Sequence, residues 1–345
     1  MTSMRQAWGE TLVELGRDND KLTVVDADLA PSTKATLFES AYPQRFIQAG
    51  IAEQNAVGMA AGLASLGFIP WLSSFGVFFT QRSLDQIRML VSQTHMNVKF
   101  GGAYSGLLNG SSGKTHEDVE DIAIMRAMPN MTVLSPADAE ETKAAVRWAT
   151  GYDMPVYLRL SRDDAGDLPE AGNDDGFAIG QPKVLRKASD MASSKTSINS
   201  DSTSTYGSVV LISTGAQSIR TLESADLLAS AGLQTTVIHL PSIKPLDETA
   251  ILEAIGDARY VFTVEEHSIY GGIGGLVSEI VAGRPRSAQP GVHGSATADA
   301  MAPQVVRIGL NDEWTQCGPN DFLLDRYGLS AQRVAQKVEE TVGIA

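Results

Sequence analysis

The stretch GIAEQN, residues 50–55, places one carboxylate, that of Glu53, between a predicted strand and a predicted helix. The strand covers residues 45–49, and the helix covers residues 52–66 and is rich in small side chains. Aromatic rings follow a second predicted strand in the segment SSFGVFF, residues 73–79. After a third strand, Thr115 and His116 lie in a loop rich in glycine and serine. An acid, aromatic rings and a histidine at successive strand ends indicate a cofactor site.

Around this stretch, apolar β-branched runs alternate with helical periods. Strands are predicted over residues 22–28, 69–75, 98–103, 131–134 and 156–160, and helices over 4–16, 52–66, 84–93 and 137–150. Strand-helix alternation favours a mostly parallel sheet flanked by helices on both faces. The first part of the chain is therefore predicted to be an α/β domain over residues 1–165.

A second α/β domain is predicted over residues 208–345. Its strands cover 209–213, 236–240, 260–265 and 305–310, and a helix covers 218–231. Residues 166–207 form the connection, in which 188–206 are mostly serine, threonine and other small polar residues. That composition predicts a flexible insertion, which we interpret as a hairpin tip. At 345 residues the chain is long enough for two such cores.

Bulk composition excludes several classes of function. The formal net charge of −14 argues against nucleic acid and against anionic membrane surfaces as partners. Cys317 is the single cysteine, so neither an internal disulfide nor a cysteine zinc cluster is possible. The N-terminus lacks an apolar signal core, and no apolar run approaches the ~20 residues of a membrane span. A cytoplasmic protein is expected.

These residues, in this order, resemble the pyrimidine-binding domain of transketolase, and the resemblance continues through the transketolase C-terminal domain. It implies a thiamine diphosphate-binding fold followed by a second α/β domain. Members of the family also carry an earlier domain whose Gly-Asp-Gly motif holds the diphosphate, and the present sequence contains no such motif. The resemblance therefore implies the second subunit of a split transketolase, active only with an N-terminal, diphosphate-binding partner. An α2β2 heterotetramer is expected, with Mg²⁺ (or Ca²⁺) bound mainly by the partner and no metal ligand in this chain.

The resemblance assigns the cofactor contacts to three residues. Glu53 corresponds to the glutamate that hydrogen-bonds the aminopyrimidine ring, where burial keeps a proton available to share. Phe75 and Phe78 correspond to the aromatic wall beside that ring. The competing interpretations are a glutamate that the helix dipole favours and an aromatic pair that belongs to the core.

Further positions concern the substrate. Arg5, Ser32 and Arg162 match residues that bind the phosphate end of the sugar, and guanidinium groups suit a phosphate or a sulfonate. His116 matches a catalytic histidine that contacts the donor ketose and the reacting hydroxyl or carbonyl. Each residue alone is typical of an ordinary surface or capping position.

Departures from the family pattern fall on substrate-facing positions. The family carries Gly-Glu-Asp-Gly before this histidine, but residues 110–113 read GSSG, so the expected aspartate is missing and Ser112 stands in its place. A second expected histidine falls on Tyr104, and a tyrosine of the aromatic wall falls on Gln81 or Leu84. The cofactor chemistry is thus expected to be retained and sugar recognition to be changed. A ketose with another anionic end group, or a branched sugar, fits this pattern.

Other interpretations stay open at this point. The β subunit of a 2-oxo acid dehydrogenase has the same layout, deoxyxylulose phosphate synthase shares the GIAEQ motif, and an assembly or regulatory module is the non-enzyme alternative. Glu117 and Asp118 are not expected to form a metal site, because adjacent side chains in a loop rarely converge. The glycine run at 271–275 is interpreted as packing and subunit contact, since its spacing departs from the dinucleotide motif.

Overall fold

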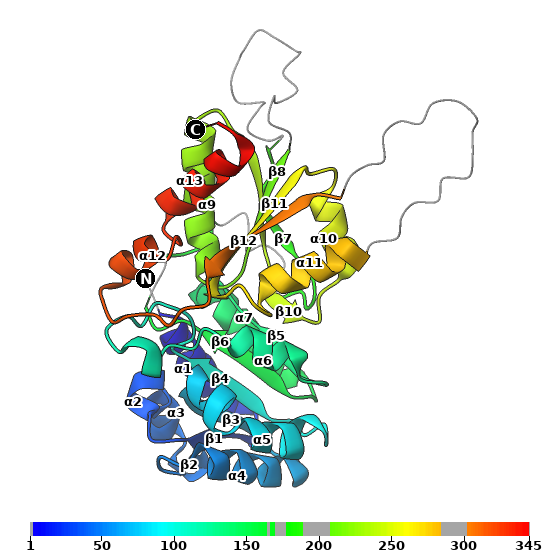
Figure 1. Cartoon of the computed structure of the whole chain (residues 1–345). Helices are drawn as coiled ribbons and strands as arrows, with labels where there is room; N and C mark the ends of the chain where they lie inside the picture. Colours follow the sequence, from blue (N-terminus) through cyan, green and yellow to red (C-terminus); the bar gives the residue numbers. More distant parts are fainter. Residues whose placement is uncertain (1–2, 164–165, 170–176, 189–207, 284–301, 345) are drawn as a thin grey trace, which may run out of the picture.

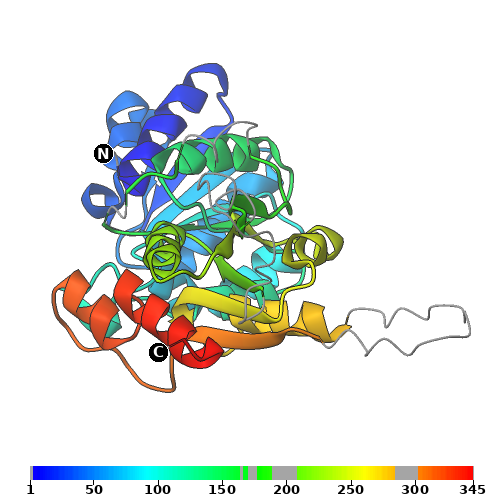
Figure 2. The ribbon, with the colours of Figure 1, turned by 90° about the horizontal axis from the view of Figure 1, so that it is seen from above.

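The computed structural model describes residues 3–163, 166–169, 177–188, 208–283 and 302–344. They form two α/β units, one above the other in Figure 1, each built on one sheet. Seen from above in Figure 2, the N-terminal segments, drawn in blue, lie to one side of the second unit. None of the described helices is both long and apolar enough to cross a membrane.

The first unit contains a seven-stranded sheet in the order β10-β5-β6-β4-β3-β1-β2. All neighbouring pairs are parallel except β10 with β5. The strands are β1 Leu22–Asp26, β2 Phe46–Gln48, β3 Ile69–Phe75, β4 Lys99–Ala103, β5 Thr132–Leu134, β6 Val156–Leu160 and β10 Ser242–Lys244. Four of these are buried along their whole length, as expected for strands covered by helices on both faces.

Helices cover both faces of this sheet, as Figure 1 shows. They are α1 Met4–Asp18, α2 Ala30–Thr33, α3 Thr36–Ala41, α4 Glu53–Ser65, α5 Leu84–Gln86, α6 Asp121–Ala127 and α7 Ala139–Gly151, with short 3₁₀ turns η1 Pro43–Arg45 and η4 Gly113–Thr115. The predicted helix over residues 84–93 is present up to Ser92, but most of it has π-helical geometry. The chain forms π-helical turns η2 Phe78–Arg82 and η3 Ile87–Ser92 with only α5 between them. Ser83 contributes to this irregularity, because its hydroxyl donates to the carbonyl of Phe78 (3.2 Å).

The second unit contains a five-stranded sheet in the order β12-β11-β8-β9-β7. Its strands are β7 Lys183–Arg186, β8 Val209–Ser213, β9 Thr235–His239, β11 Tyr260–Ser268 and β12 Gln304–Leu310, and its helices are α9 Gln217–Ser230, α10 Glu248–Ile255, α11 Ile273–Gly283, α12 Asn320–Arg326 and α13 Ala331–Val342. Strand β7 lies within the stretch predicted as a connection and pairs antiparallel with β9. Of the predicted insertion at 188–206, all but Ala188 lies outside the described residues.

Strand β10 joins the two units. It follows β9 in the chain but pairs antiparallel with β5 of the first sheet. One cluster of buried apolar side chains includes residues of both units, such as Phe100 and Val261. Because this contact is extensive and apolar, the loops of the second unit are held in place over one end of the first sheet.

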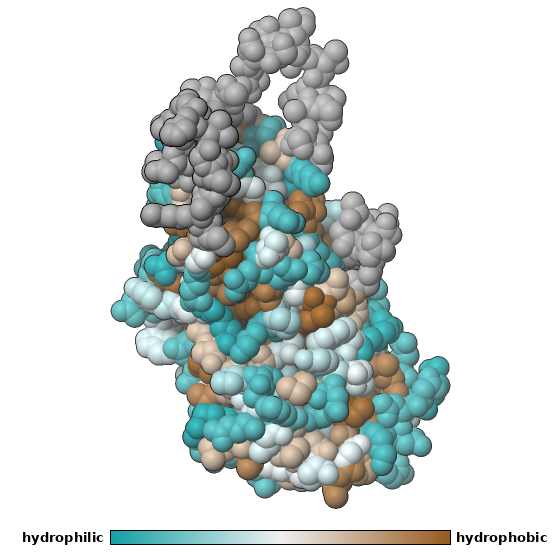
Figure 3. All heavy atoms as spheres, turned by 90° about the vertical axis from the view of Figure 1, so that its right-hand side faces the viewer, coloured by the Kyte–Doolittle hydropathy of each residue, from teal (hydrophilic) through white to brown (hydrophobic). Residues whose placement is uncertain are grey.

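The face of the molecule drawn in Figure 3 differs between the two units. Polar residues cover most of the first unit, and its hydrophobic residues are scattered singly. Hydrophobic residues gather over the second unit, between the grey segments. Single exposed apolar residues are normal on a soluble protein, so only the gathered patch differs from an ordinary surface.

Candidate active site at the strand ends of the first sheet

Glu53 is the first residue of α4 and follows β2 after a short loop, and only 1% of its surface is exposed. The helix N-terminus favours a negative charge there. Both carboxylate oxygens contact one nitrogen, Nη1 of Arg82, at 2.7 and 2.8 Å. Arg82 ends the π-turn η2, and its side chain is 45% exposed. The structure therefore places the predicted acid in a buried position and gives it a cationic partner that the sequence did not indicate.

Four rings form a cluster beside this acid. Phe75 ends β3 and stacks on Phe78 (centroids 5.7 Å apart) and on Tyr104 (3.8 Å). His116 meets both phenylalanines edge-on, at 5.9 and 5.7 Å. Offset stacks and edge contacts of this kind stabilise a fixed arrangement of rings. Tyr104 has a left-handed backbone (φ 63°), which persists in a non-glycine residue only where the surroundings impose it.

The predicted anion-binding residues also lie together. Arg5 of α1 donates through Nη1 to the carbonyl of Ser32 and through Nε to the carbonyl of Arg162 (3.1 Å). The guanidinium groups of Arg5 and Arg162 lie 5.1 and 5.6 Å from the ring centroid of Tyr104. Ser32 thus contributes its backbone oxygen to the contact that the structure shows. Two cations and a phenol ring meet at one point, although they come from three distant segments.

His116 and Ser112 have different surroundings. The Nδ1 atom of His116 is 2.8 Å from the hydroxyl of Thr115, and Asn109 donates to the His116 carbonyl (3.3 Å). Ser112 is half-buried just before η4, and its backbone N–H donates to the carbonyl of Asn109 (3.0 Å). Among the described residues, no hydrogen bond joins the Ser112 side chain to the ring cluster. His116 therefore contacts the ring cluster, whereas Ser112 is bonded through its backbone to Asn109 within the loop.

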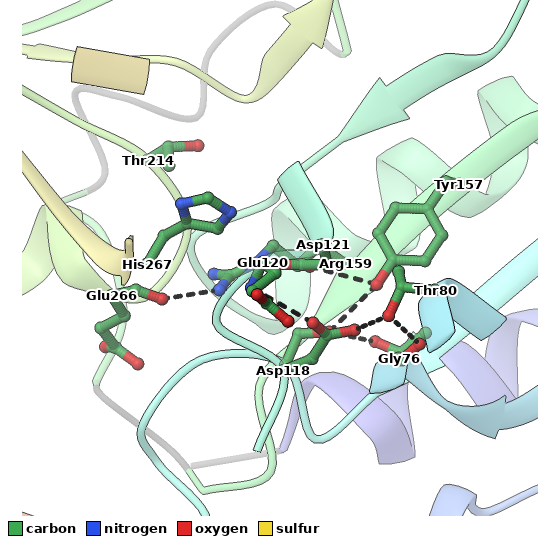
Figure 4. Close-up of polar contacts among 12 residues, drawn as sticks. Gly76, Thr80, Asp118, Glu120, Asp121, Tyr157, Arg159, Thr214, Glu266 and His267 are labelled. Atoms are coloured by element: carbon green, nitrogen blue, oxygen red, sulfur yellow. Dashed lines mark hydrogen bonds and ion pairs between the residues drawn. The ribbon is translucent and has the colours of Figure 1, made fainter. Parts of the chain in front are cut away.

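Figure 4 shows a buried polar network that contains Asp118, Asp121 and Arg159. The hydroxyl of Thr80 donates to Asp118 (2.7 Å), and Tyr157 donates to Asp121 (3.1 Å). Gly76 lies against this network, where an added Cβ would come within 2.8 Å of the Tyr157 oxygen. Burial and then the nearby carboxylate of Asp121 raise the pKa of Asp118 to about 8. Burial in this network therefore favours the protonated form of Asp118.

The same network continues into the second unit. Arg159 donates to Asp121 (2.8 Å) and to the carbonyl of Glu266 (2.8 Å), both drawn in Figure 4. The Glu266 carboxylate accepts from the backbone of Leu107 (3.1 Å) and forms an ion pair with Arg220. Removing one member would leave a buried charge without a partner, which is strongly destabilising. The substrate loop and the second unit are therefore connected by buried charges.

A loop of the second unit, residues 312–320, packs over the predicted substrate loop. Thr315 donates to Glu117, and Asn320 bonds both the backbone N–H of Gly110 (3.1 Å) and Asp163 (2.7 Å). Burial raises the pKa of Glu117 to about 7, against the effect of that hydroxyl. A cavity of about 410 Å³ opens there, lined by Ser111, Arg162, Asp163, Gly318, Pro319, Asn320 and Asp321. Sequence patterns gave no sign that the second unit reaches this place.

Two further expectations concern metals and glycines. Glu117 and Asp118 turn to different partners, Thr315 and Thr80. Within the described part of the chain, no group of three acidic, histidine or cysteine residues is arranged to hold a metal ion. The glycine run leads into α11, where Glu265 accepts from the backbone of Ile273 (2.7 Å) and Gly274 (2.9 Å). A carboxylate thus occupies the helix N-terminus that a dinucleotide phosphate would need.

A buried carboxylate thus lies beside stacked rings at the strand ends of an α/β sheet, and the chain belongs to the transketolase family. Residues 1–166 match the transketolase pyrimidine-binding domain. Residues 204–334 match the transketolase C-terminal domain. The protein is therefore a transferase of this family, and it corresponds to the C-terminal half of the longer transketolases.

Individual relatives agree with this assignment. A transketolase C-terminal section from Methanocaldococcus jannaschii is 36% identical, over 98% of this chain and 95% of that protein. A 6-deoxy-6-sulfo-D-fructose transketolase subunit from a Clostridium species is 30% identical, over 98% and 94%. A solved structure described as a split gene transketolase, inactive β4 tetramer, is 34% identical and superposes with a TM-score of 0.81, over 100% and 99% of the two chains.

The family implies thiamine diphosphate, and the residues present fit its aminopyrimidine ring. Glu53 offers a buried carboxylate to ring nitrogens, and Phe75 and Phe78 offer parallel apolar faces (interplanar angle 19°). Two residues that matter here escaped the sequence argument. No sequence pattern indicated that Arg82 contacts Glu53, because the two residues lie 29 positions apart in the chain. Asn320 lies in a different domain from the loop that it binds.

Proposed function

We propose that this chain is the second subunit of a split transketolase that moves a two-carbon ketol unit from an anionic ketose to an aldose. The observation that carries this proposal is the arrangement at the strand ends. Glu53 and the rings lie at one end of the site, and the Arg5–Arg162 pair lies beyond Tyr104. The site thus offers an acid for the cofactor and cations for the distal end of a sugar.

At the cofactor end, Glu53 would hold the aminopyrimidine ring of thiamine diphosphate, and Phe75 and Phe78 would fix the plane of that ring. When bound, this cofactor supplies a stabilised carbanion that accepts the ketol unit. A carboxyl excluded from water can share a proton with a ring nitrogen, and Glu53 is 1% exposed. Mg²⁺ (or Ca²⁺) and the diphosphate would be held mainly by the partner subunit.

His116 would contact the reacting hydroxyl or carbonyl of the donor. Its Nδ1 is engaged with Thr115, which leaves Nε2 as the nitrogen for the substrate. The edge contacts to Phe75 and Phe78 hold the imidazole next to the ring platform. A histidine fixed in this way can donate or accept a hydrogen bond without a further loss of side-chain conformational freedom.

At the distal end, Arg5 and Arg162 would bind a phosphate or a sulfonate, with Ser32 and Ser112 at the rim. Planar guanidinium groups form charge-assisted bonds with either anion. Tyr104 stands where most transketolases have a histidine, and it fills the space between the two arginines and Phe75. The sulfosugar relative and an apulose-4-phosphate transketolase subunit, 30% identical over 99% of this chain, support an unusual ketose.

The proposed assembly is an α2β2 heterotetramer with an N-terminal transketolase subunit, in the cytoplasm. Ile51, two residues before Glu53, is 74% exposed, and Met89 and Leu90 of η3, which packs against α4, are 43% and 41% exposed. Apolar residues that surround a catalytic group are typical of an interface that completes the site. The partner would cover them and bring the diphosphate-binding residues to Glu53.

The test is to capture the tagged chain from its native lysate with thiamine diphosphate and Mg²⁺ present, and to assay the complex on a panel of ketoses. We expect a roughly equimolar partner that contains Gly-Asp-Gly, and transfer from a ketose with a phosphate or sulfonate end. Xylulose 5-phosphate as the best donor would contradict the changed specificity. Release of carbon dioxide from a 2-oxo acid, without ketol transfer, would favour a dehydrogenase β subunit instead.

A further inference from the structure

The contact between Glu53 and Arg82 is the least expected feature of the site. Glu53 is fully buried, and a single nitrogen of Arg82 bonds both of its oxygens (2.7 and 2.8 Å). In the isolated chain this guanidinium therefore balances a charge that would otherwise be buried alone. Both oxygens are occupied by a partner from the chain itself.

Arg82 also covers the aromatic platform. Its guanidinium carbon lies 4.3 Å from the ring centroid of Phe78, which is a cation–π distance. The carbonyl of Arg82 accepts from the side chain of Gln54 (3.1 Å), so the end of η2 is tied to the start of α4. A flat group with N–H donors thus lies on the ring and bonds the acid, which are the two contacts proposed for the aminopyrimidine.

Glu53 cannot bond Arg82 and the aminopyrimidine ring at the same time. Both carboxylate oxygens of Glu53 are bonded to the guanidinium, so a ring nitrogen can bond this carboxylate only after the contact with Arg82 is broken. The side chain of Arg82 is 45% exposed, so it can leave the acid for solvent without opening the core. Its backbone can stay in place, because the contact with Gln54 involves only the carbonyl.

We propose that Arg82 is a positioning residue that occupies the cofactor's contacts in the unassembled subunit and is displaced when thiamine diphosphate binds. Arg82 holds Glu53 in place and keeps the buried charge paired until the partner subunit arrives. It thereby stabilises the chain without cofactor and weakens the apparent affinity for cofactor in the complex, because binding must first break the Glu53–Arg82 pair. The inference rests on the proposed function.

The test uses Arg82→Met in the complex with the captured partner. Methionine keeps an apolar side chain over Phe78 and removes the charge. Thiamine diphosphate is titrated at fixed Mg²⁺, and binding is followed by quenching of intrinsic fluorescence. We expect a dissociation constant at least tenfold lower than in the wild type, together with a lower melting temperature of the chain alone. A purely structural arginine would lower the melting temperature without tightening cofactor binding.

The matched control is Arg88→Met, because Arg88 is similarly exposed and pairs only with the exposed Asp85 (3.0 Å). Arg88→Met should change neither the dissociation constant of thiamine diphosphate nor the melting temperature. An equal or higher dissociation constant for Arg82→Met overturns the inference. Should that variant fail to fold, Arg82→Lys replaces it, and a lower dissociation constant is again expected, with an unchanged or higher value overturning the inference. A wild-type complex that binds no thiamine diphosphate would instead reject the proposed function.

Discussion

Glu53 and Glu141 are both buried glutamates in the first turn of a helix, and yet their surroundings differ completely. Glu53 has one charged partner, Arg82, whose side chain is 45% exposed. Glu141 of α7 is bonded by His239 (2.7 Å), by Lys183 (2.5 Å) and by the backbone of Ala137 (2.8 Å). An acid with one exchangeable partner is available for a ligand, whereas an acid with three enclosed partners belongs to the framework.

The surroundings of Glu141 also show how the framework is joined. His239 and Lys183 come from β9 and β7 of the second sheet, while Glu141 belongs to the first unit. The hydroxyl of Ser218 lies 2.7 Å from the other nitrogen of His239. A serine, a histidine and a glutamate in this order resemble a nucleophilic triad, but all three are buried. Their role is therefore to hold the two units together.

The largest effect is expected from Glu53→Gln. Turnover of the assembled complex should fall by about 10²–10⁴-fold, because proton sharing with the cofactor is lost while the shape of the side chain is kept. Assembly with the partner, measured by size-exclusion chromatography, should be unchanged. Asp85→Asn, an exposed carboxylate in the neighbouring α5, serves as the control and should retain full turnover. Wild-type turnover of Glu53→Gln would remove the proposed mechanism.

Glu141→Gln should lower the folding stability and leave the turnover of the complex unchanged. Burial alone would raise the pKa of Glu141, but His239 and Lys183 hold it at about 2, against an ordinary value of 4.5. This difference corresponds to about 3 kcal/mol of folding free energy at neutral pH. The contribution is present above pH 4.5 and is lost as the pH falls towards about 2.

Chemical denaturation at several pH values measures this effect. The Glu141→Gln variant should be less stable than the wild type at pH 7 by about 3 kcal/mol, and the difference should shrink below pH 4.5. Glu140→Gln is the control, because the adjacent Glu140 is exposed and forms only a surface pair with Lys143. A difference that does not change with pH would show that the ion pair is not its source.

Arg162→Met should have a smaller effect, confined to the substrate. Losing one charge-assisted contact should raise KM for an anionic ketose about tenfold and leave kcat nearly unchanged. Steady-state assays with an anionic ketose and an uncharged ketose distinguish the loss of an anion site from a general loss of activity. Only KM for the anionic sugar should rise. Arg147→Met, at a similarly exposed site paired with Glu14, should change neither. Equal losses for both sugars would contradict an anion site at Arg162.

Phe78→Leu should have the smallest effect. The change removes a ring contact with the cofactor worth about 1 kcal/mol, so the dissociation constant of thiamine diphosphate should rise about fivefold. Fluorescence titration of the complex measures it. Phe79→Leu is a useful contrast, because Phe79 is fully buried against Phe100 (5.3 Å) and should lower stability without a specific loss of cofactor affinity.

Much of the first sheet was predictable from sequence. The predicted ranges of β3 and β6 agree with the structure, because buried parallel strands are short runs of apolar residues between clear helices. Strand β10 was not predicted, since three residues that pair antiparallel at an edge leave no periodic pattern. The helix over 84–93 was predicted but its π geometry was not, because residue composition does not distinguish α from π turns.

The candidate site divides in the same way. Glu53, Phe75, Phe78, Arg5 and Arg162 were predicted as site residues from motifs. In the structure Arg5 contacts Arg162, and Phe75 stacks on Phe78. Which charges pair there was not predictable, because pairing depends on distances between segments that are far apart in the chain. Arg82 reaches Glu53 only through the π-turn.

By itself the sequence determined the family, the order of strands and helices in the first unit, and the residue types available for chemistry, because these follow from local periodicity and from motifs. The tertiary structure decided which acid is held by one exposed arginine and which is enclosed by three partners. It also decided that the loop at 312–320 covers the substrate loop. Charge and hydrogen-bond energies depend on the distance between groups and on their burial, and only the folded chain sets these quantities.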